Sequence, residues 1–164
     1  MDIIQLLVNE FDEEAVRTRK MLERLPGDKW DWKPHAKSMP LKSLVVHIAE
    51  LPTWITMGLT TDELDFAKAE YKPTEVNSRK DVLDLFERSA QTGRDSLVNA
   101  KEEDLLPKWI LRTGDNIHST MTKYEVVRHA FSQTIHHRAQ LGVYLRLLDI
   151  AIPGTYGPSA DESF

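Results

Sequence analysis

Apolar residues recur three and four positions apart in four stretches of this sequence, which predicts four amphipathic helices. The first stretch begins after Asp2, a residue that can cap a helix, and ends at Leu25-Pro26-Gly27. The second is expected to begin near Ser38, with Pro40 in its first turn, and Pro52 should kink or interrupt it. The face that the first stretch should bury comprises Ile4, Leu7, Val8, Phe11, Ala15, Thr18 and Leu22.

The second half of the chain carries the other two predicted helices. Ser78-Arg79-Lys80-Asp81 resembles an N-terminal capping box and follows a polar linker that runs through Tyr71-Lys72-Pro73-Thr74. Thr122-Lys123-Tyr124-Glu125 is a second capping box, and the helical pattern continues from it to about Asp149. Lys101 to Met121 lacks sustained periodicity and is expected to form a loop or a short hairpin.

Four amphipathic stretches without clear strand alternation predict an all-α four-helix bundle. A chain of 164 residues is expected to form one domain, over residues 1–164, with a core of its own. After the fourth helix the segment from Pro153 to Ser159 should be extended, and Tyr156 in this tail is expected to dock on the bundle.

The composition narrows the possible functions. The chain has no cysteine, which excludes disulfides, cysteinate metal ligands and a thiol nucleophile of its own. With a net charge of -5 and an isoelectric point near 5.7, nucleic-acid binding is not expected. Neither a secretion leader nor a membrane-spanning run is evident, which predicts a cytoplasmic protein without membrane association. The motifs of phosphate-binding loops, serine esterases and zinc proteases are also absent from the sequence.

Two histidines are the best candidates for chemistry. His137 lies in the middle of an apolar stripe on the fourth predicted helix, with Gln133 one turn before it, and His47 shares a helix face with Leu44 and Leu51. Because imidazole is the commonest metal ligand, the two helices are expected to assemble an interior metal site. The alternative is that both are core histidines satisfied by hydrogen bonds, with Gln133 as one partner, and the spacing favours neither reading.

Other polar residues near this stripe are weaker candidates. His129 and His136 fall at its edge, and His35 and His118 are expected to have no role in a site. Glu50, one turn after His47, either orients a ligand or acts as a general base, although an exposed carboxylate at a helix end is the favoured reading.

These residues and the segments around them resemble the DinB family, also called DinB/YfiT-like. The resemblance spans nearly the whole chain, and its most specific part is the histidine-arginine-glutamine run together with the tail. The segments that carry it are His47 to Pro52, His136 to Arg146, Pro153 to Glu162, Asp31 to His35 and Asp62 to Phe66.

The resemblance implies a four-helix bundle, often a homodimer, with a divalent metal held by one histidine of the second helix and two of the last helix four residues apart. His47 and His137 match two of these positions, and Gln133 occupies the third, where a neutral amide is a poorer ligand for zinc or nickel than imidazole. His129 reaches the site only if the last helix is rotated or distorted. Family members with known activity are similar to metal-dependent transferases that join small thiols to electrophiles, or to thiol-dependent isomerases.

The leading hypothesis is therefore a metal-dependent transferase or hydrolase of the DinB type. It uses zinc, nickel or manganese on His47, His137 and Gln133, with water or an external low-molecular-weight thiolate at an open position. The competing hypothesis is a non-catalytic bundle, a binding or stress-associated protein with a degenerate metal site. Gln133 is the residue that separates the two hypotheses.

Overall fold

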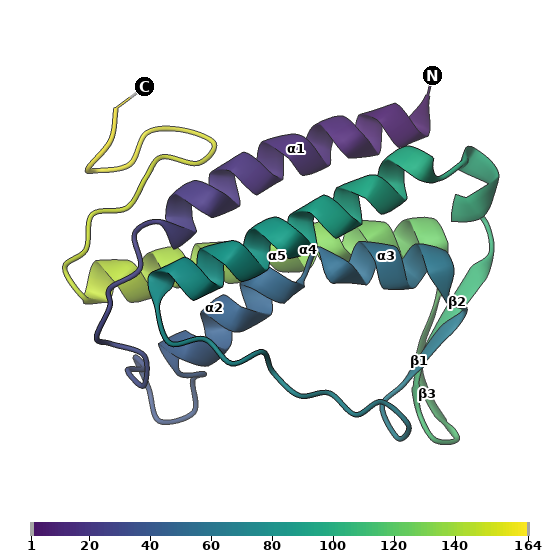
Figure 1. The fold of residues 1–164 in the computed structure, drawn as a ribbon, viewed down its shortest axis with the longest axis horizontal. Coiled ribbons are helices and arrows are strands. Elements are labelled where there is room, and N and C mark those ends of the chain that lie inside the picture. Colours follow the sequence, from purple (N-terminus) through teal and green to yellow (C-terminus); the bar gives the residue numbers. More distant parts are fainter. Residues whose placement is uncertain (1, 164) are drawn as a thin grey trace.

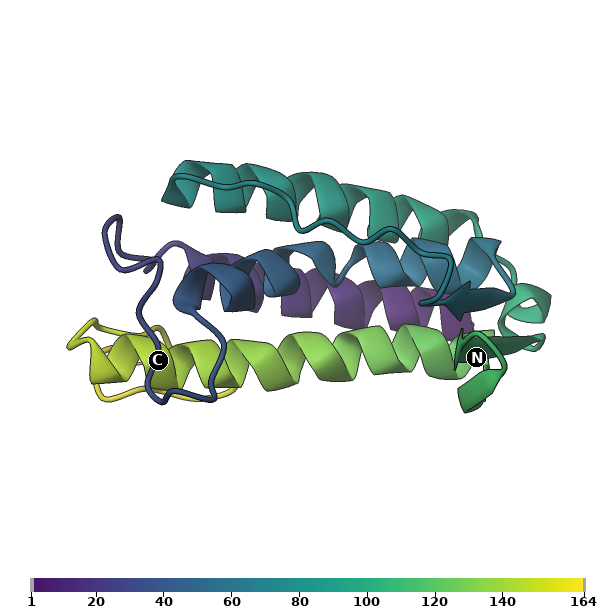
Figure 2. The ribbon, with the colours of Figure 1, turned by 90° about the horizontal axis from the view of Figure 1, so that it is seen from below.

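The predicted helices pack side by side into an elongated bundle in the computed structural model, which describes residues 2–163 (Figure 1). Within these residues the elements in chain order are α1 (Ile3–Leu22), α2 (Leu41–Glu50), α3 (Thr53–Thr60), β1 (Glu63–Asp65), α4 (Arg79–Asn99), a 3-10 helix (Glu102–Leu105), β2 (Lys108–Thr113), β3 (Asn116–Thr122) and α5 (Lys123–Leu147). Seen from below, α2 and α3 follow one another in a row between α4 and α5, with α1 behind them (Figure 2). No helix in the part of the chain that is described is long and apolar enough to cross a membrane.

Side-chain caps fix the beginnings of three helices where the sequence predicts them. The carboxylate of Asp2 accepts a hydrogen bond from the Gln5 amide, and the Ser78 hydroxyl accepts one from the Asp81 amide at 3.1 Å. At α5 the capping box is complete, because Thr122 and Glu125 each accept a hydrogen bond from the other's backbone N–H. These caps satisfy N–H groups that have no partner within the helix.

The start of α2 differs from the prediction. Ser38 does not cap the helix: its amide donates to the carbonyl of His35 in a turn, and the first helical residue is Leu41. A helix capped by Ser38 would place Met39 in helical geometry directly before Pro40, and the proline ring disfavours that geometry. Pro40 therefore becomes the residue that precedes the helix.

Pro52 interrupts the second predicted helix, as expected. Leu51 closes α2 and α3 begins at Thr53. The break packs closely on Gly93 of α4, where a Cβ atom would lie 2.6 Å from the carbonyl oxygen of Pro52. A glycine at this point lets the interrupted helix approach α4, so the second arm of the bundle consists of two short helices.

A small sheet at one end of the bundle corrects the prediction of an all-α protein. β2 and β3 form the hairpin expected between the last two helices, and β1 adds to β2 in parallel, with Leu64 opposite Leu111. The Asp65 carboxylate joins the strands by accepting hydrogen bonds from the amides of Gly114 and Ala67. β1 has only three residues, which is too short for the alternation that marks a strand.

The tail docks on the bundle through Tyr156, as predicted. Its hydroxyl lies 2.8 Å from both carboxylate oxygens of Glu14 on α1 and accepts a hydrogen bond from Arg138 of α5. Arg138 is 2% exposed and forms an ion pair with Glu14 at 2.6 Å. The tail thus completes a buried polar cluster between α1 and α5.

Candidate functional site

The structure brings His47 and His137 together. Their ring centres lie 4.6 Å apart, with the ring planes at 83°. Both side chains are half-buried, and the flanking residues Val46, Ile48 and Arg138 are buried, which fixes the helices that carry the rings. Within residues 2–163, neither ring nitrogen of His47 forms a hydrogen bond.

Gln140, one turn after His137, holds the ring of His137 in a defined orientation. The Nδ1 of His137 donates to the Gln140 Oε1 at 2.8 Å, and the Gln140 Nε2 donates to the Nε2 of His136 at 3.0 Å. With its proton on Nδ1, His137 keeps the lone pair of Nε2 free for a ligand. His136 is exposed, but its ring centre lies 4.9 Å from that of His137. The sequence placed His136 at the edge of the stripe and gave Gln140 no role.

Both histidines are held in their neutral form. Burial lowers the pKa of His47, repulsion between the protonated forms of His47 and His137 lowers it further, and the carboxylate of Glu50 opposes this. Burial also lowers the pKa of His137, against the opposing effect of its hydrogen bond to Gln140. A neutral imidazole has a free lone pair, so this environment suits a ligand or a general base.

Gln133 and His129 do not line the same groove as the two histidines. Gln133 is half-buried one turn before His137 on α5, and within residues 2–163 its amide forms no hydrogen bond. Gln133 is therefore not a hydrogen-bond partner of either histidine, although the reading of the pair as core histidines had named it as one partner. His129 is exposed, two turns before His137, with its ring centre 6.4 Å from that of Trp54.

Glu50 anchors a segment of chain beside the histidines. The segment from Phe66 to Ser78, called the strap below, runs back along α3 and α2 from β1 to the beginning of α4 (Figure 1). Glu50 accepts hydrogen bonds from the Tyr71 hydroxyl at 2.7 Å and from the Thr74 hydroxyl at 2.6 Å, and a weaker one from the Thr74 amide. Although the ring of Tyr71 is largely exposed, the loss of water around its hydroxyl and the contact with Glu50 raise the pKa of Tyr71 to about 12. Glu50 is thus neither a free carboxylate at a helix end nor a free base.

A groove of about 430 Å³ opens beside the histidine pair, between α2, α5 and the strap. This volume falls within the range of small-molecule sites. Its charged side chains are Lys42 and Glu75, and no feature of the sequence had pointed to either residue. The lining comprises Met39, Lys42, Ser43, Val46, His47, Tyr71, Pro73, Thr74, Glu75 and His137.

The residues present fit part of a metal centre. Two imidazoles that share one zinc ion at bond lengths of about 2.0 Å have ring centres roughly 5 Å apart. The observed separation of 4.6 Å, the free Nε2 of His137 and the unpartnered ring of His47 agree with this. Within residues 2–163, however, no three His, Cys, Asp or Glu side chains are grouped to hold a metal ion. The donor set fits an ion held by two imidazoles and outside ligands, and it does not fit a closed site of three such side chains.

Comparison with known proteins identifies relatives of this fold. A model of the DinB family matches residues 1–163. A search of curated proteins gives no match. Among solved structures, a DinB-like protein from Bacillus subtilis is 19% identical with a TM-score of 0.71, and the alignment covers 97% of this chain and 99% of that one.

Two further structures carry descriptions of an activity. YfiT from Bacillus subtilis, described as a probable metal-dependent hydrolase with an unusual four-helix bundle topology, is 12% identical with a TM-score of 0.64, over 90% of this chain and 89% of that one. A mycothiol-dependent maleylpyruvate isomerase is 13% identical with a TM-score of 0.62, over 85% of this chain and 60% of that one. At these identities the likeness shows a shared fold.

Proposed function

Because this chain belongs to the DinB family, we propose that it is a metal-assisted enzyme, a hydrolase or thiol transferase acting on a small molecule in the groove beside His47 and His137. The observation that carries the proposal is the meeting of these two neutral, half-buried imidazoles at the inner wall of the groove. The printed descriptions of two structural relatives, one metal-dependent and one thiol-dependent, support the same class of chemistry.

The two imidazoles would hold a divalent cation through ring nitrogens. Gln133 lies one turn before His137 but outside the lining of the groove, so it would act as a weak third ligand, through a bridging water. Such a cation would lower the pKa of a water or an external thiol, so that either becomes a nucleophile near neutral pH. Because the chain has no cysteine, a thiol would have to come from outside.

The chain's own residues prepare this site. Gln140 keeps the proton of His137 on Nδ1 and aims the ring. Arg138, tied to Glu14 of α1, fixes the rotation of α5 about its axis, so that His137 faces α2. The strap, bonded to Glu50, forms one side of the groove through Tyr71, Thr74 and Glu75.

Metal titration of the protein made without an affinity tag tests the proposal. We expect zinc, nickel or manganese to bind at one equivalent by calorimetry, and His47→Ala and His137→Ala each to abolish the binding. His118→Ala, at an exposed position of β3, is the matched control and should bind metal like the wild type. Absence of stoichiometric binding of all three metals would refute the proposal.

A non-catalytic binding protein is the second candidate. The observation that favours it is that, within residues 2–163, no three His, Cys, Asp or Glu side chains are grouped so that they could hold a metal ion. On this reading the groove binds a small molecule without turning it over, and metal does not alter the affinity.

A further inference from the structure

Among the described residues that line the groove, Lys42 alone carries a positive charge, and its ion pair is weak. Its ammonium group lies 3.5 Å from the carboxylate of Glu75 on the strap, and the Glu75 side chain is 88% exposed. Exposed ion pairs of this kind contribute little to stability, because water screens the two charges. Within residues 2–163 the ammonium group of Lys42 has no other ion pair and forms no hydrogen bond, so its N–H donors are available to a ligand.

The acidic groups around Lys42 leave room for an incoming anion. Glu50 is occupied by three hydrogen bonds from the strap and does not line the groove. Glu75 is held by Lys42 alone among the charged groups described, so it can move into solvent when a competitor arrives. The neighbouring Ser43 hydroxyl also lines the groove, and within residues 2–163 it has no hydrogen-bond partner. Lys42 and Ser43 together offer donors suited to a carboxylate.

The walls of the groove define the rest of such a ligand. Met39, Val46 and Pro73 are apolar, and the two imidazoles lie at the inner wall. A chain with a net charge of -5 repels anions in general, so an anion is retained only where a local cation meets it. A ligand with one carboxylate and an apolar body can pair with Lys42 and pack against the apolar walls at the same time.

We infer that the groove binds small organic acids, with the ligand carboxylate on Lys42 in place of Glu75 and the apolar body directed toward His47 and His137. The inference deepens the proposed function by naming the class of substrate, and it rests on that proposal for the chemistry at the imidazoles. Binding of the acid itself requires only the groove and Lys42.

A matched pair of fluorinated probes tests the inference by ligand-observed fluorine NMR on protein freed of metal with a chelator. We expect para-fluorophenylacetate to bind and its neutral counterpart, para-fluorophenylacetamide, to bind at least roughly 10-fold more weakly, because the amide lacks the charge that Lys42 recognises. Lys42→Gln should weaken binding of the acid by a similar factor. Glu75→Gln, which removes the competing carboxylate, should strengthen it about 2-fold or more.

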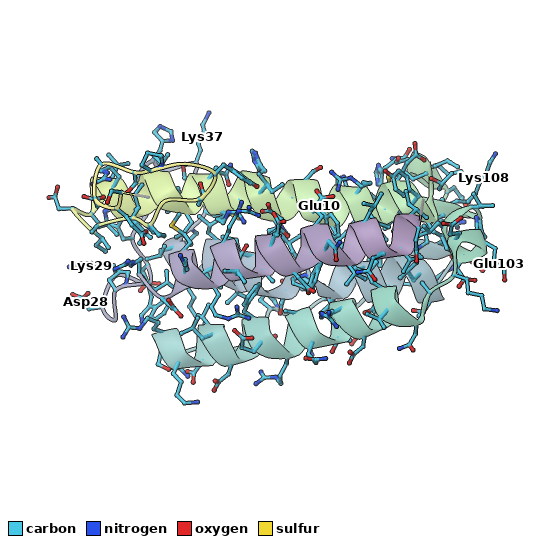
Figure 3. All side chains as sticks on the ribbon, turned by 90° about the horizontal axis from the view of Figure 1, so that it is seen from above. Glu10, Asp28, Lys29, Lys37, Glu103 and Lys108 are labelled. Carbon is cyan, nitrogen blue, oxygen red and sulfur yellow. The ribbon has the colours of Figure 1, made fainter. Side chains whose placement is uncertain are left out.

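Lys108→Gln is the control, since Lys108 lies at the end of the bundle opposite to Lys37 and α2 (Figure 3). It should bind the acid like the wild type. Equal affinities for acid and amide, or an unchanged affinity in Lys42→Gln, would overturn the inference, and so would binding that appears only after zinc is added and ignores Lys42. Acid binding through Lys42 in a protein that binds no metal would sustain the inference while the proposed function fails.

Discussion

The Nδ1 of His137 donates a hydrogen bond to the side-chain oxygen of Gln140 at 2.8 Å, so a neutral amide determines which nitrogen of the imidazole is free. In metal sites the outer nitrogen of a ligating histidine is usually held in this way by a carbonyl or a carboxylate. The side-chain amide of Gln140 also donates a hydrogen bond to His136. The oxygen of Gln140 therefore cannot rotate away from His137 unless this second hydrogen bond breaks as well.

Replacing Gln140 by methionine, which has a similar size, should release the tautomer of His137. Without the acceptor, we expect the proton to move from Nδ1 to Nε2 in a large part of the population, and metal affinity to fall by about 10- to 100-fold. Long-range proton–nitrogen NMR of the histidine rings reports the tautomer directly. His136→Ala leaves the bond to His137 intact and should keep the wild-type tautomer. An unchanged tautomer in Gln140→Met would show that Gln140 has no positioning role.

Replacing Gln133 by histidine should strengthen metal binding. Residues four apart lie on one helix face, so a histidine at this position offers a second imidazole beside His137, and we expect affinity to rise by about 10- to 100-fold. Calorimetry with zinc measures the change. Ser132→His places the new imidazole on an exposed position one residue earlier and should leave the affinity unchanged. If Gln133→His brings no gain, the non-catalytic reading is favoured.

The stability of the metal-free protein should fall in mild acid. The pKa values of His47 and His137 are lowered from 6.5 in the folded state, so the unfolded chain binds more protons below that pH. The contribution of these two residues to the free energy of unfolding is fully present above pH 6.5. It is lost as the pH falls from 6.5 through the pKa values that they have in the folded state. Urea denaturation at a series of pH values measures this loss. In the double variant His47→Gln/His137→Gln the free energy of unfolding should depend less on pH. The same dependence as in the wild type would show that these two histidines do not cause the loss of stability.

Breaking the buried ion pair between Arg138 and Glu14 should destabilise the fold strongly. Arg138→Leu removes the buried cation and leaves the carboxylate of Glu14 with Arg17 and the Tyr156 hydroxyl; breaking a buried pair typically costs about 3–5 kcal/mol, and these two partners place the expected loss at the lower end. Arg128→Leu is the matched control, because Arg128 pairs with Glu10 across the same two helices near the surface, where loss of a pair costs about 0–1 kcal/mol. Chemical denaturation compares the two. If both variants lost a similar amount of unfolding free energy, burial would not be what makes the ion pair of Arg138 strong.

The sequence was a good guide wherever one residue type dictates local geometry. Pro52 ended a helix because proline lacks the amide that the helix needs, and the capping box at Thr122 set the beginning of α5. β1 could not be found in this way, because its three residues depend on pairing with β2, which lies more than forty residues later in the chain. The predicted start at Ser38 failed because the restraint that Pro40 places on the preceding residue outweighed the capping preference of serine.

The candidate site was predictable only in part for a similar reason. Helical spacing brought out His47 and His137, since both lie on stripes that a bundle must bury. The roles of Glu50, Tyr71 and Lys42 depend on the path of the strap, which has no periodic pattern. Spacing measured from His137 placed His136 too far round the helix to matter, but a long side chain, Gln140, connects the two rings.

The strap gives the groove an entrance that can open independently of the bundle. Residues 66 to 75 are exposed, and among the described contacts of residues 70 to 75 the attachments are the hydrogen bonds to Glu50 and the ion pair of Glu75 with Lys42. Releasing these few contacts exposes the histidines while the helices stay packed, so local opening needs far less free energy than unfolding. We therefore expect substitutions at Tyr71 or Thr74 to change the rate at which a molecule leaves the groove while the melting temperature stays close to that of the wild type.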